Sequence, residues 1–197
     1  LSHEQELALM GACPLLAMQE VGMPLNLLSV IAVYAALSKE MGLPLRWPGK
    51  ELAFRKMFQL TDAGLLARAA EWSGTAPGAA DQTFNITNGD YFRWEQLWSK
   101  IAVAFDMDMG PIQTVDLSRM MADKERLWQS MIEKYGLQST AFADAANWAF
   151  GNYVLGNEWD VMSDTLKARK AGFHECQDSE ARFVEQLKEL RAEKFVP

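Results

Sequence analysis

Tyrosine and lysine side chains on one face of a helix can act together on a substrate oxygen, as a proton donor and a positive charge. Tyr34 and Lys39 come closest to such a pair, but they are five residues apart. Residues four apart lie above one another on a helix, whereas residues five apart point to different faces. We therefore expect Tyr34 in the core, Lys39 in solvent near the end of its helix, and no catalytic residue from this pair.

A glycine-rich phosphate loop needs its glycines between a strand and the N-terminus of a helix. Gly74 and Gly78 lie between an expected helix and an expected strand, which is the reverse order. No other segment offers backbone N–H groups to a pyrophosphate in this way. We expect no cofactor-binding residue in this chain.

The sequence also gives no support for a metal site or for a catalytic nucleophile. The chain has two cysteines and two histidines, none in the spacing of a zinc site: Cys13, Cys176, His3 and His174. Asp106 and Asp108 lie beside a Gly-Pro turn, where solvated side chains are the expectation. His174 lies beside Glu175, and we expect a solvated loop residue rather than a general base.

The composition narrows the class of protein. The 197 residues are 49% hydrophobic and 23% charged, which is typical of one soluble globular domain. Seven Trp, ten Phe and eleven Met suit either an irregular core or a pocket for an apolar ligand. The net charge of −7 argues against nucleic acid and anionic membrane surfaces, because both attract clustered cations.

The sequence indicates neither a membrane span nor an export signal. The apolar run at residues 7–18 is too short to cross a bilayer, and acidic residues precede it where a signal peptide has positive charge. Two cysteines far apart suit a reducing compartment. We expect a cytoplasmic protein.

Helical patterns dominate the chain and must position any site. Residues 23–41 are apolar nearly all round, which predicts a helix buried on more than one face and ended by Gly42. Residues 83–87 form the best candidate strand, and residues 43–47 form another. Further helices are expected at residues 50–58, 61–72, 93–105, 116–135, 141–153, 164–170 and from Asp178 onwards. The fold class is therefore mainly α with two or three short strands.

Several segments occur in the order in which one enzyme family has them. Gly-Met-Pro-Leu-Asn at 22–26 resembles that family's Gly-Asn-x-Met-Asn loop, with Met23 in place of its first Asn. The other matching segments are residues 31–36, 43–49, 61–62, 84–90, 147–173 and 190–197. Together they resemble the C-terminal half of the progesterone 5β-reductase/iridoid synthase-like reductases, a branch of the extended short-chain dehydrogenases. The similarity covers about residues 22 to 197.

This resemblance implies a substrate-side portion without the Rossmann half. Enzymes of the family use NADPH to reduce the carbon–carbon double bond of an enone or enal. Their glycine-rich loop and their catalytic Tyr and Lys lie in the N-terminal half, and none has a counterpart here. The resemblance therefore implies no cofactor in this chain, although NADPH belongs to the intact family.

The same resemblance divides the chain at residue 21. Residues 22–197 are expected to form a single mostly helical, substrate-side domain. Residues 1–21 are atypical, because the stretch at 12–18 lacks the family's Arg-Pro and closing Gly. A truncated or frame-altered gene, or a proteolytic fragment, would explain the departure.

Four substrate-binding residues are implied by the resemblance: Asn26, Trp148, Phe150 and Tyr153. Residues 150 and 153 are neighbours on a helix, while 148 lies well round from 150. All three aromatic side chains can line one cavity only if the helix bends or ends near Gly151, since glycine weakens a helix interior. The expected ligand is a hydrophobic small molecule.

Three functions are open at this point. The first is a substrate-binding portion of an enone or enal reductase, inactive alone. The second is a non-catalytic helical module that homo-oligomerises or binds a partner chain. The third, an independent enzyme with an unrecognised site, is opposed by the missing catalytic groups. We expect self-association through an exposed face around Ile31, Leu65, Phe84 and Ile86, which in the family would lie against the nucleotide-binding sheet.

Overall fold

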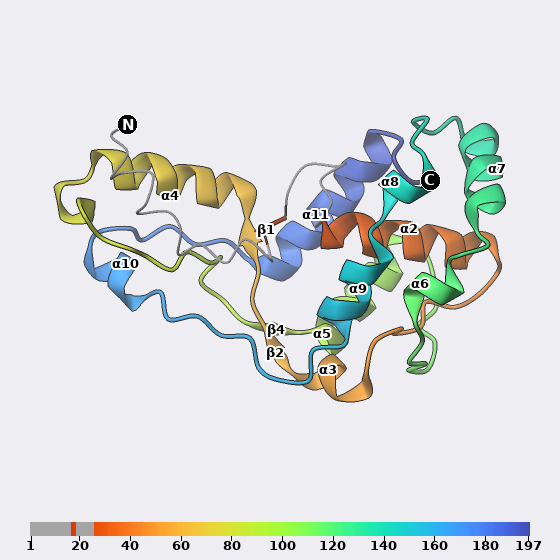
Figure 1. Ribbon diagram of the computed structural model, residues 1–197, viewed down its shortest axis with the longest axis horizontal. Helices are drawn as coiled ribbons and strands as arrows, with labels where there is room; N and C mark the ends of the chain where they lie inside the picture. Colours follow the sequence, from red (N-terminus) through yellow and green to blue (C-terminus); the bar gives the residue numbers. More distant parts are fainter. Residues whose placement is uncertain (1–16, 19–25) are drawn as a thin grey trace.

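The computed structural model describes residues 17–18 and 26–197. A broad helical region lies beside a narrower extension that carries α4 and α10 (Figure 1). We call these the body and the lobe. The body is organised around four helices: α2 (Leu27–Glu40), α5 (Trp94–Ala104), α9 (Trp148–Leu155) and α11 (Ser179–Ala192). Shorter helices at its edges are α3 (Glu51–Arg55), α6 (Leu117–Met120), α7 (Glu125–Tyr135) and α8 (Phe142–Ala145). The lobe contains α4 (Ala63–Thr75), η2 (Pro77–Ala79) and α10 (Leu166–Lys170).

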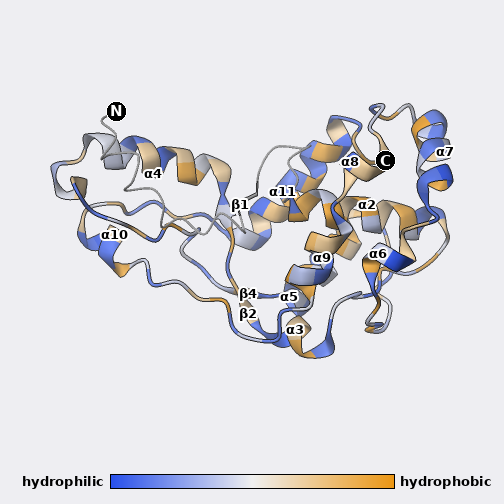
Figure 2. Ribbon diagram, viewed as in Figure 1, coloured by the Kyte–Doolittle hydropathy of each residue, from blue (hydrophilic) through white to orange (hydrophobic). Residues whose placement is uncertain are grey.

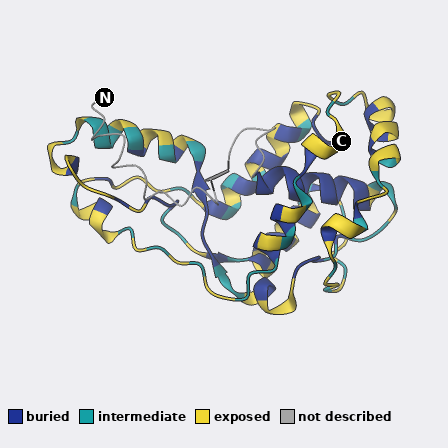
Figure 3. Ribbon diagram, viewed as in Figure 1, coloured by how far each residue is buried: buried dark blue, intermediate teal, exposed yellow. Residues whose placement is uncertain are grey.

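Helix α2 is the central helix of the body. All of its residues from Leu27 to Ser38 are buried, as its uniformly apolar sequence predicts (Figure 3). It begins after Asn26, whose Oδ1 accepts the backbone N–H of Ser29 at 3.1 Å. It is followed by Gly42 at φ +69°, a left-handed conformation that glycine adopts without strain. The predicted start at residue 23 lies outside the described residues.

The aromatic core of the body lies between α5 and the segment before α3. Trp94 and Trp98 share one face of α5 and both contact Trp47, with ring centroids 5.6 and 5.0 Å away. All three side chains are buried. The i, i+4 spacing read from the sequence therefore identified the buried face of this helix.

The lobe has a separate and smaller core. Its buried members are Leu65, Ala69, Ala79, Phe84, Ile86, Ala168 and Phe173. Trp72 of α4 closes it, with its ring centroid 5.0 Å from Phe84 and 5.3 Å from Phe173. On the outside, α10 is largely hydrophilic (Figure 2).

The strands are shorter than expected and mostly lie elsewhere. Strand β1 (Ala17–Met18) pairs in parallel with β3 (Thr61–Asp62), and β2 (Met57–Phe58) pairs antiparallel with β4 (Phe92–Arg93). The strand expected at residues 43–47 is reduced to one bridge, Leu45 to Met109. The strand expected at residues 83–87 is not formed. That segment contacts β3 through the Thr61 hydroxyl, which donates to the Ile86 carbonyl, and through no continuous ladder.

The expected helix at residues 141–153 is two helices. Ala146 is extended at φ −155° and separates α8 from α9, which Asn147 then caps. The expected helix at 50–58 ends earlier, at Arg55, because β2 follows. The caps at Asp62 and Asp178 are confirmed. Within the described part of the chain, no helix has the length and apolar character to cross a membrane.

Candidate functional site

Tyr34 and Lys39 have separate environments. Burial, the largest influence, raises the pKa of Tyr34 to about 12. Its hydroxyl donates to the Arg46 carbonyl at 3.0 Å. Lys39 is exposed at the end of α2, where Nζ donates to the Phe105 carbonyl at 2.6 Å and lies 3.6 Å from Asp106. The two side chains do not form a catalytic pair.

The other chemistry-bearing residues are dispersed on the surface. His174 and Cys176 are both exposed. Asp106 has φ +51° in the turn after α5, as a solvated turn residue would. Across residues 17–18 and 26–197, no three His, Cys, Asp or Glu side chains are placed to hold a metal ion. Cys13 and His3 lie outside the described residues.

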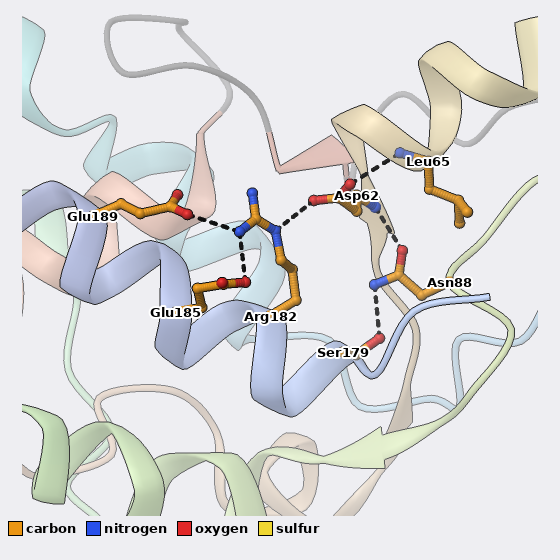
Figure 4. Close-up of polar contacts among 7 residues, drawn as sticks. All are labelled: Asp62, Leu65, Asn88, Ser179, Arg182, Glu185 and Glu189. Carbon is orange, nitrogen blue, oxygen red and sulfur yellow. Dashed lines mark hydrogen bonds and ion pairs between the residues drawn. The ribbon is translucent and has the colours of Figure 1, made fainter. Parts of the chain in front are cut away.

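A partly buried polar network joins the body to the lobe (Figure 4). Arg182 of α11 donates through Nε to Asp62 at 2.9 Å and through Nη1 to Glu185 and Glu189. Asp62 in turn caps α4 by accepting the Leu65 N–H at 2.9 Å.

A turn at residues 88–90 completes this network. Asn88 Oδ1 accepts the Asp62 N–H at 2.6 Å, and Asn88 Nδ2 donates to Ser179 Oγ at 3.0 Å. The Ser179 hydroxyl donates to Asp90 at 2.6 Å. We call Asp62, Asn88, Asp90, Ser179 and Arg182 the junction network.

Asp62 and Arg182 form the ion pair of the junction network. Burial, the largest influence on Asp62, would raise its pKa, but the hydrogen bonds and charge of Arg182 and the N–H groups of Leu65 and Gly64 hold it below the usual value. Its carboxyl is therefore ionised at neutral pH, and the guanidinium beside it is always charged. Neither group is poised to transfer a proton. The network is suited to positioning α4 on α11, not to catalysis.

Asn26 acts within the fold of the body. Its side chain is buried and caps α2 through Ser29, whose hydroxyl donates back to the Asn26 carbonyl at 3.0 Å. An Asn at this position stabilises the helix by satisfying an N–H that the helix itself leaves unpaired. In this structure Asn26 therefore orients α2.

The three aromatic residues expected to share a cavity are separated. Helix α9 runs unbroken through Gly151, which packs so closely on Val30 that a Cβ there would lie 2.7 Å from a Val30 methyl group. The bend that a shared cavity would require is absent from α9. Phe150 is buried in the body core, whereas Tyr153 is 59% exposed. Trp148 is half-buried at the first position of α9.

Trp148 instead meets an aromatic ring from α8. Its ring centroid lies 5.9 Å from that of Phe142. The two rings, with Met121, line a hollow of about 570 Å³ bounded by α6, α7, α8 and α9. Four alanines keep it open: Ala122, Ala143, Ala146 and Ala149. We call this the aromatic hollow; it is partly open to solvent, and polar side chains such as Ser118, Glu125 and Asp144 share its lining.

Two other hollows have different chemistry. A groove of about 1010 Å³ lies between α5 and α11, with Val103 and Val184 among its lining. A hollow of about 610 Å³ near the C-terminus is lined by Glu40, which forms an ion pair with Lys134, and by four cations: Lys39, Lys134, Arg191 and Lys194. The first three lie in the last turns of α2, α7 and α11, where positive charge complements the helix dipole.

Five helix N-termini are closed to a dinucleotide. A pyrophosphate needs open backbone N–H groups at a helix N-terminus. Five helices have these groups closed by the side chain of their own N-cap residue: Asn26, Asp62, Asp116, Asn147 and Asp178. Three of the five caps are carboxylates, which repel phosphate.

Sequence reasoning did not identify Phe142 and Met121 as partners of Trp148, or Arg182 as the partner of Asp62. The sequence shows the apolar residues of 141–153. No sequence pattern indicates the break at Ala146, which turns Phe142 toward Trp148. Asp62 was recognised as a cap. Its ion pair joins residues 120 positions apart, which no local pattern reveals.

Comparison with known proteins identifies relatives. No protein-family model matches the chain. An (S)-8-oxocitronellyl enol synthase of Nepeta cataria is 35% identical over 178 residues, covering 88% of this chain and 45% of that protein. An enzyme of the same name from Antirrhinum majus is 31% identical, and a 3-oxo-Delta(4,5)-steroid 5-beta-reductase of Arabidopsis thaliana is also 31% identical, each over 176 residues and with the same coverage. The chain thus spans about 45% of the length of these curated relatives.

A solved structure shares the fold at lower identity. It is the terminal R domain from the myxalamid PKS-NRPS biosynthetic pathway, with a TM-score of 0.51 and 16% identity. The match covers 92% of this chain and 43% of that one. The likeness supports the architecture alone.

Proposed function

This chain belongs to the progesterone 5β-reductase/iridoid synthase-like reductases, and on that premise we propose that it is the substrate-binding portion of an NAD(P)H-dependent enone or enal reductase, inactive by itself. The observation that carries the proposal is the aromatic hollow, which lies at one end of residues 147–173, a segment that resembles the family. The chain matches about 45% of its relatives' length, which is in keeping with a portion rather than a whole enzyme. The side-chain caps on five of its helix N-termini support the proposal that the nucleotide site lies elsewhere.

The residues in and around the hollow have different proposed roles in ligand binding. Trp148 and Phe142 supply flat apolar walls that exclude water from a hydrophobic ligand. Phe150 is buried in the body core, and its proposed role is to hold α9 in place. Asn26 positions α2, against which α9 packs through Gly151. Tyr153 is exposed outside the hollow, and its proposed contact is with a ligand or chain segment that covers this face.

NAD(P)H, when bound to the intact family enzyme, supplies the hydride. The described residues offer it no phosphate cradle, so the contribution proposed for this chain is confined to the substrate. Trp148 and Phe142 would bind and orient the enone or enal against the reacting half. A cytoplasmic location remains part of the proposal.

A second candidate function is a helical module that pairs with a copy of itself. The prediction of an exposed self-association face at Ile31, Leu65, Phe84 and Ile86 is wrong, because all four side chains are buried. The α5–α11 groove offers a different surface, since Val103 beside it is 75% exposed. Sedimentation of the purified chain tests this candidate: a compact monomer at high micromolar concentration would exclude it.

Two titrations test the primary proposal. Calorimetry with NADPH should show no saturable binding, and progesterone should quench tryptophan fluorescence at micromolar concentration. Trp148→Phe should remove most of that quenching, whereas Trp72→Phe in the lobe should leave it. Saturable NADPH binding, or the absence of any binding of progesterone, would overturn the proposal.

A further inference from the structure

A segment on the outline of the molecule lies against β2 as an incomplete third strand. It consists of residues 159–166, which lead from α9 to α10 and which we call the strap (Figure 1). The Val161 N–H donates to the carbonyl of Met57, a residue of the β2 strand that also pairs with β4, at 2.9 Å. We propose that the other edge of the strap pairs antiparallel with the strap of a second copy, so that two molecules form a two-fold dimer.

The backbone N–H groups of the strap alternate between two edges. Those of Val161 and Ser163 point inward, where they donate to the Met57 carbonyl and to Gln59 Oε1. Those of Met162 and Asp164, which alternate with them, have no acceptor among the described residues. An extended segment places neighbouring N–H groups on opposite edges, and an edge with free groups is a template for another strand.

The side chains of the strap alternate in the same way. Val161 and Ser163 are half-buried, whereas Met162 and Leu166 are 55% and 51% exposed. Trp159, at the start of the strap, is 63% exposed. Large apolar side chains gathered on one surface mark an interaction site, and tryptophan is among the residues that contribute most at protein interfaces.

Charge identifies a second copy as the partner. Asp160 and Asp164 belong to the strap, and Lys167 and Lys170 follow it. All four are exposed, and none has an ion-pair partner in the described part of the chain. Antiparallel pairing about a two-fold axis places the start of each strap beside the end of the other. Asp160 of each molecule then approaches Lys167 of the second copy.

The other charged groups near the strap do not reverse this pattern. Glu158 forms an ion pair with Lys50 at 2.5 Å, and Arg169 donates to the Gly89 carbonyl at 3.2 Å. Lys56 precedes Met57, whose N–H donates to Asp160, and it offsets part of the acidic charge. The beginning of the strap therefore remains the more negative end, and its far end remains the more positive.

Two measurements test the inference on the purified chain. Sedimentation equilibrium gives the dissociation constant of the dimer, and hydrogen exchange at low and high protein concentration locates its interface. We expect a dimer in which the amides of Met162 and Asp164 gain protection only at high concentration. The strap lies apart from the α5–α11 groove, so the amides of α5 should exchange equally at both concentrations.

Substitutions at Met162 remove the contact at the centre of the pairing. Met162→Pro loses the outward N–H and keeps those of Val161 and Ser163, and it should weaken the dimer at least about tenfold, since the two-fold axis makes the loss occur twice. Met162→Lys keeps the N–H but brings two like charges together, and it should also weaken the dimer. Val103→Lys is the matched control: it places the same charge in the α5–α11 groove and should leave the dimer intact. Circular dichroism checks that each variant folds.

Charge reversal tests the antiparallel arrangement. Lys167→Glu should weaken the dimer about tenfold, because it sets like charges against Asp160 at both contacts. Adding Asp160→Asn to the same chain should restore most of the affinity, since the amide oxygen can still accept the Met57 N–H. Higher salt should reduce both effects.

Several results would overturn the inference. They are a compact monomer at high micromolar concentration, a dimer that Val103→Lys disrupts and Met162→Pro does not, and strap amides that stay unprotected at every concentration. Failure of Asp160→Asn to rescue Lys167→Glu would also count against the antiparallel pairing. The progesterone and NADPH titrations test the substrate role separately, so these results leave it standing.

Discussion

The body buries many more apolar side chains than the lobe does (Figure 3). In the body, α2 is surrounded on all sides, and its core includes the rings of Trp47, Trp94 and Trp98. In the lobe, α4 has only two buried residues, Leu65 and Ala69, and its remaining faces meet solvent. Stability scales with the apolar area removed from water. The body can therefore hold itself together, whereas the lobe depends on its attachment to the body.

That attachment is polar. The junction network places a partly buried ion pair, Asp62 with Arg182, where β3 and the start of α4 meet α11. Regions with few buried contacts open locally at lower free energy than the core. The lobe should thus open before the body unfolds, and the network should control how readily it does so.

The largest expected effect on stability comes from a leucine-to-alanine substitution, made once in the body and once in the lobe. Leu37→Ala in α2 and Leu65→Ala in α4 both remove a side chain that is 0% exposed. Leu37→Ala should lower the free energy of unfolding by about 3–5 kcal/mol, because a close-packed core relaxes little around a cavity. Leu65→Ala should cost about 2–3 kcal/mol, since the small lobe core can collapse. Urea titration measures both, and equal losses would contradict the comparison.

Breaking the junction should have the next largest effect. Arg182→Met leaves the Asp62 charge buried without its partner, at a cost of about 2–3 kcal/mol. Hydrogen exchange should show amides of α4 losing protection while those of α2 keep theirs. Lys100→Met is the control, because it breaks an exposed pair with Glu180 and should cost less than about 1 kcal/mol. Uniform loss of protection across both helices would argue against a separate lobe.

The same ion pair predicts a pH dependence. The pKa of Asp62 is lowered in the folded state, so its contribution is present above the unfolded pKa, about 3.9, and is lost as pH falls through the lower folded value. Stability should therefore decline below about pH 4, first in α4. Asp62→Asn should flatten this part of the stability curve, as thermal melts from about pH 3 to 6 would reveal. An unchanged acid limb in the variant would assign the decline to other carboxyls.

The smallest effects are expected at two helix ends. Gly136 follows α7 in the body at φ +63°, and a Cβ added there would have no neighbouring atom within 4 Å. Gly172 follows α10 in the lobe at φ +103°. Gly136→Ala should cost about 1 kcal/mol, the usual penalty of a left-handed alanine. Gly172→Ala should cost more, because its φ lies outside the left-handed minimum near about +57°. Thermal melts followed by circular dichroism would rank the two losses of stability. A larger loss for Gly136→Ala than for Gly172→Ala would show that the lobe adjusts its backbone freely.

Sequence reasoning succeeded where the signal was local. The buried face of α5 followed from the spacing of Trp94, Leu97, Trp98 and Ile101, all of which are buried. The family resemblance was confirmed by relatives that share up to 35% identity. Of the three aromatic residues predicted to share a cavity, Trp148 lines a hollow, whereas Phe150 and Tyr153 lie apart from it. Their proposed role in binding stays a prediction.

The sequence by itself determined the starts of α4 and α11, because a cap such as Asp62 or Asp178 acts on N–H groups three residues away. Only the tertiary structure decided the strands and the site. Residues 83–87 have strand-like alternation, yet a strand needs a partner along its whole length, and β3 supplies too little. The pairing of Trp148 with Phe142 and of Arg182 with Asp62 likewise depends on how separate segments pack. Such contacts are set by the summed packing of the whole chain, and no window of neighbouring residues contains that information.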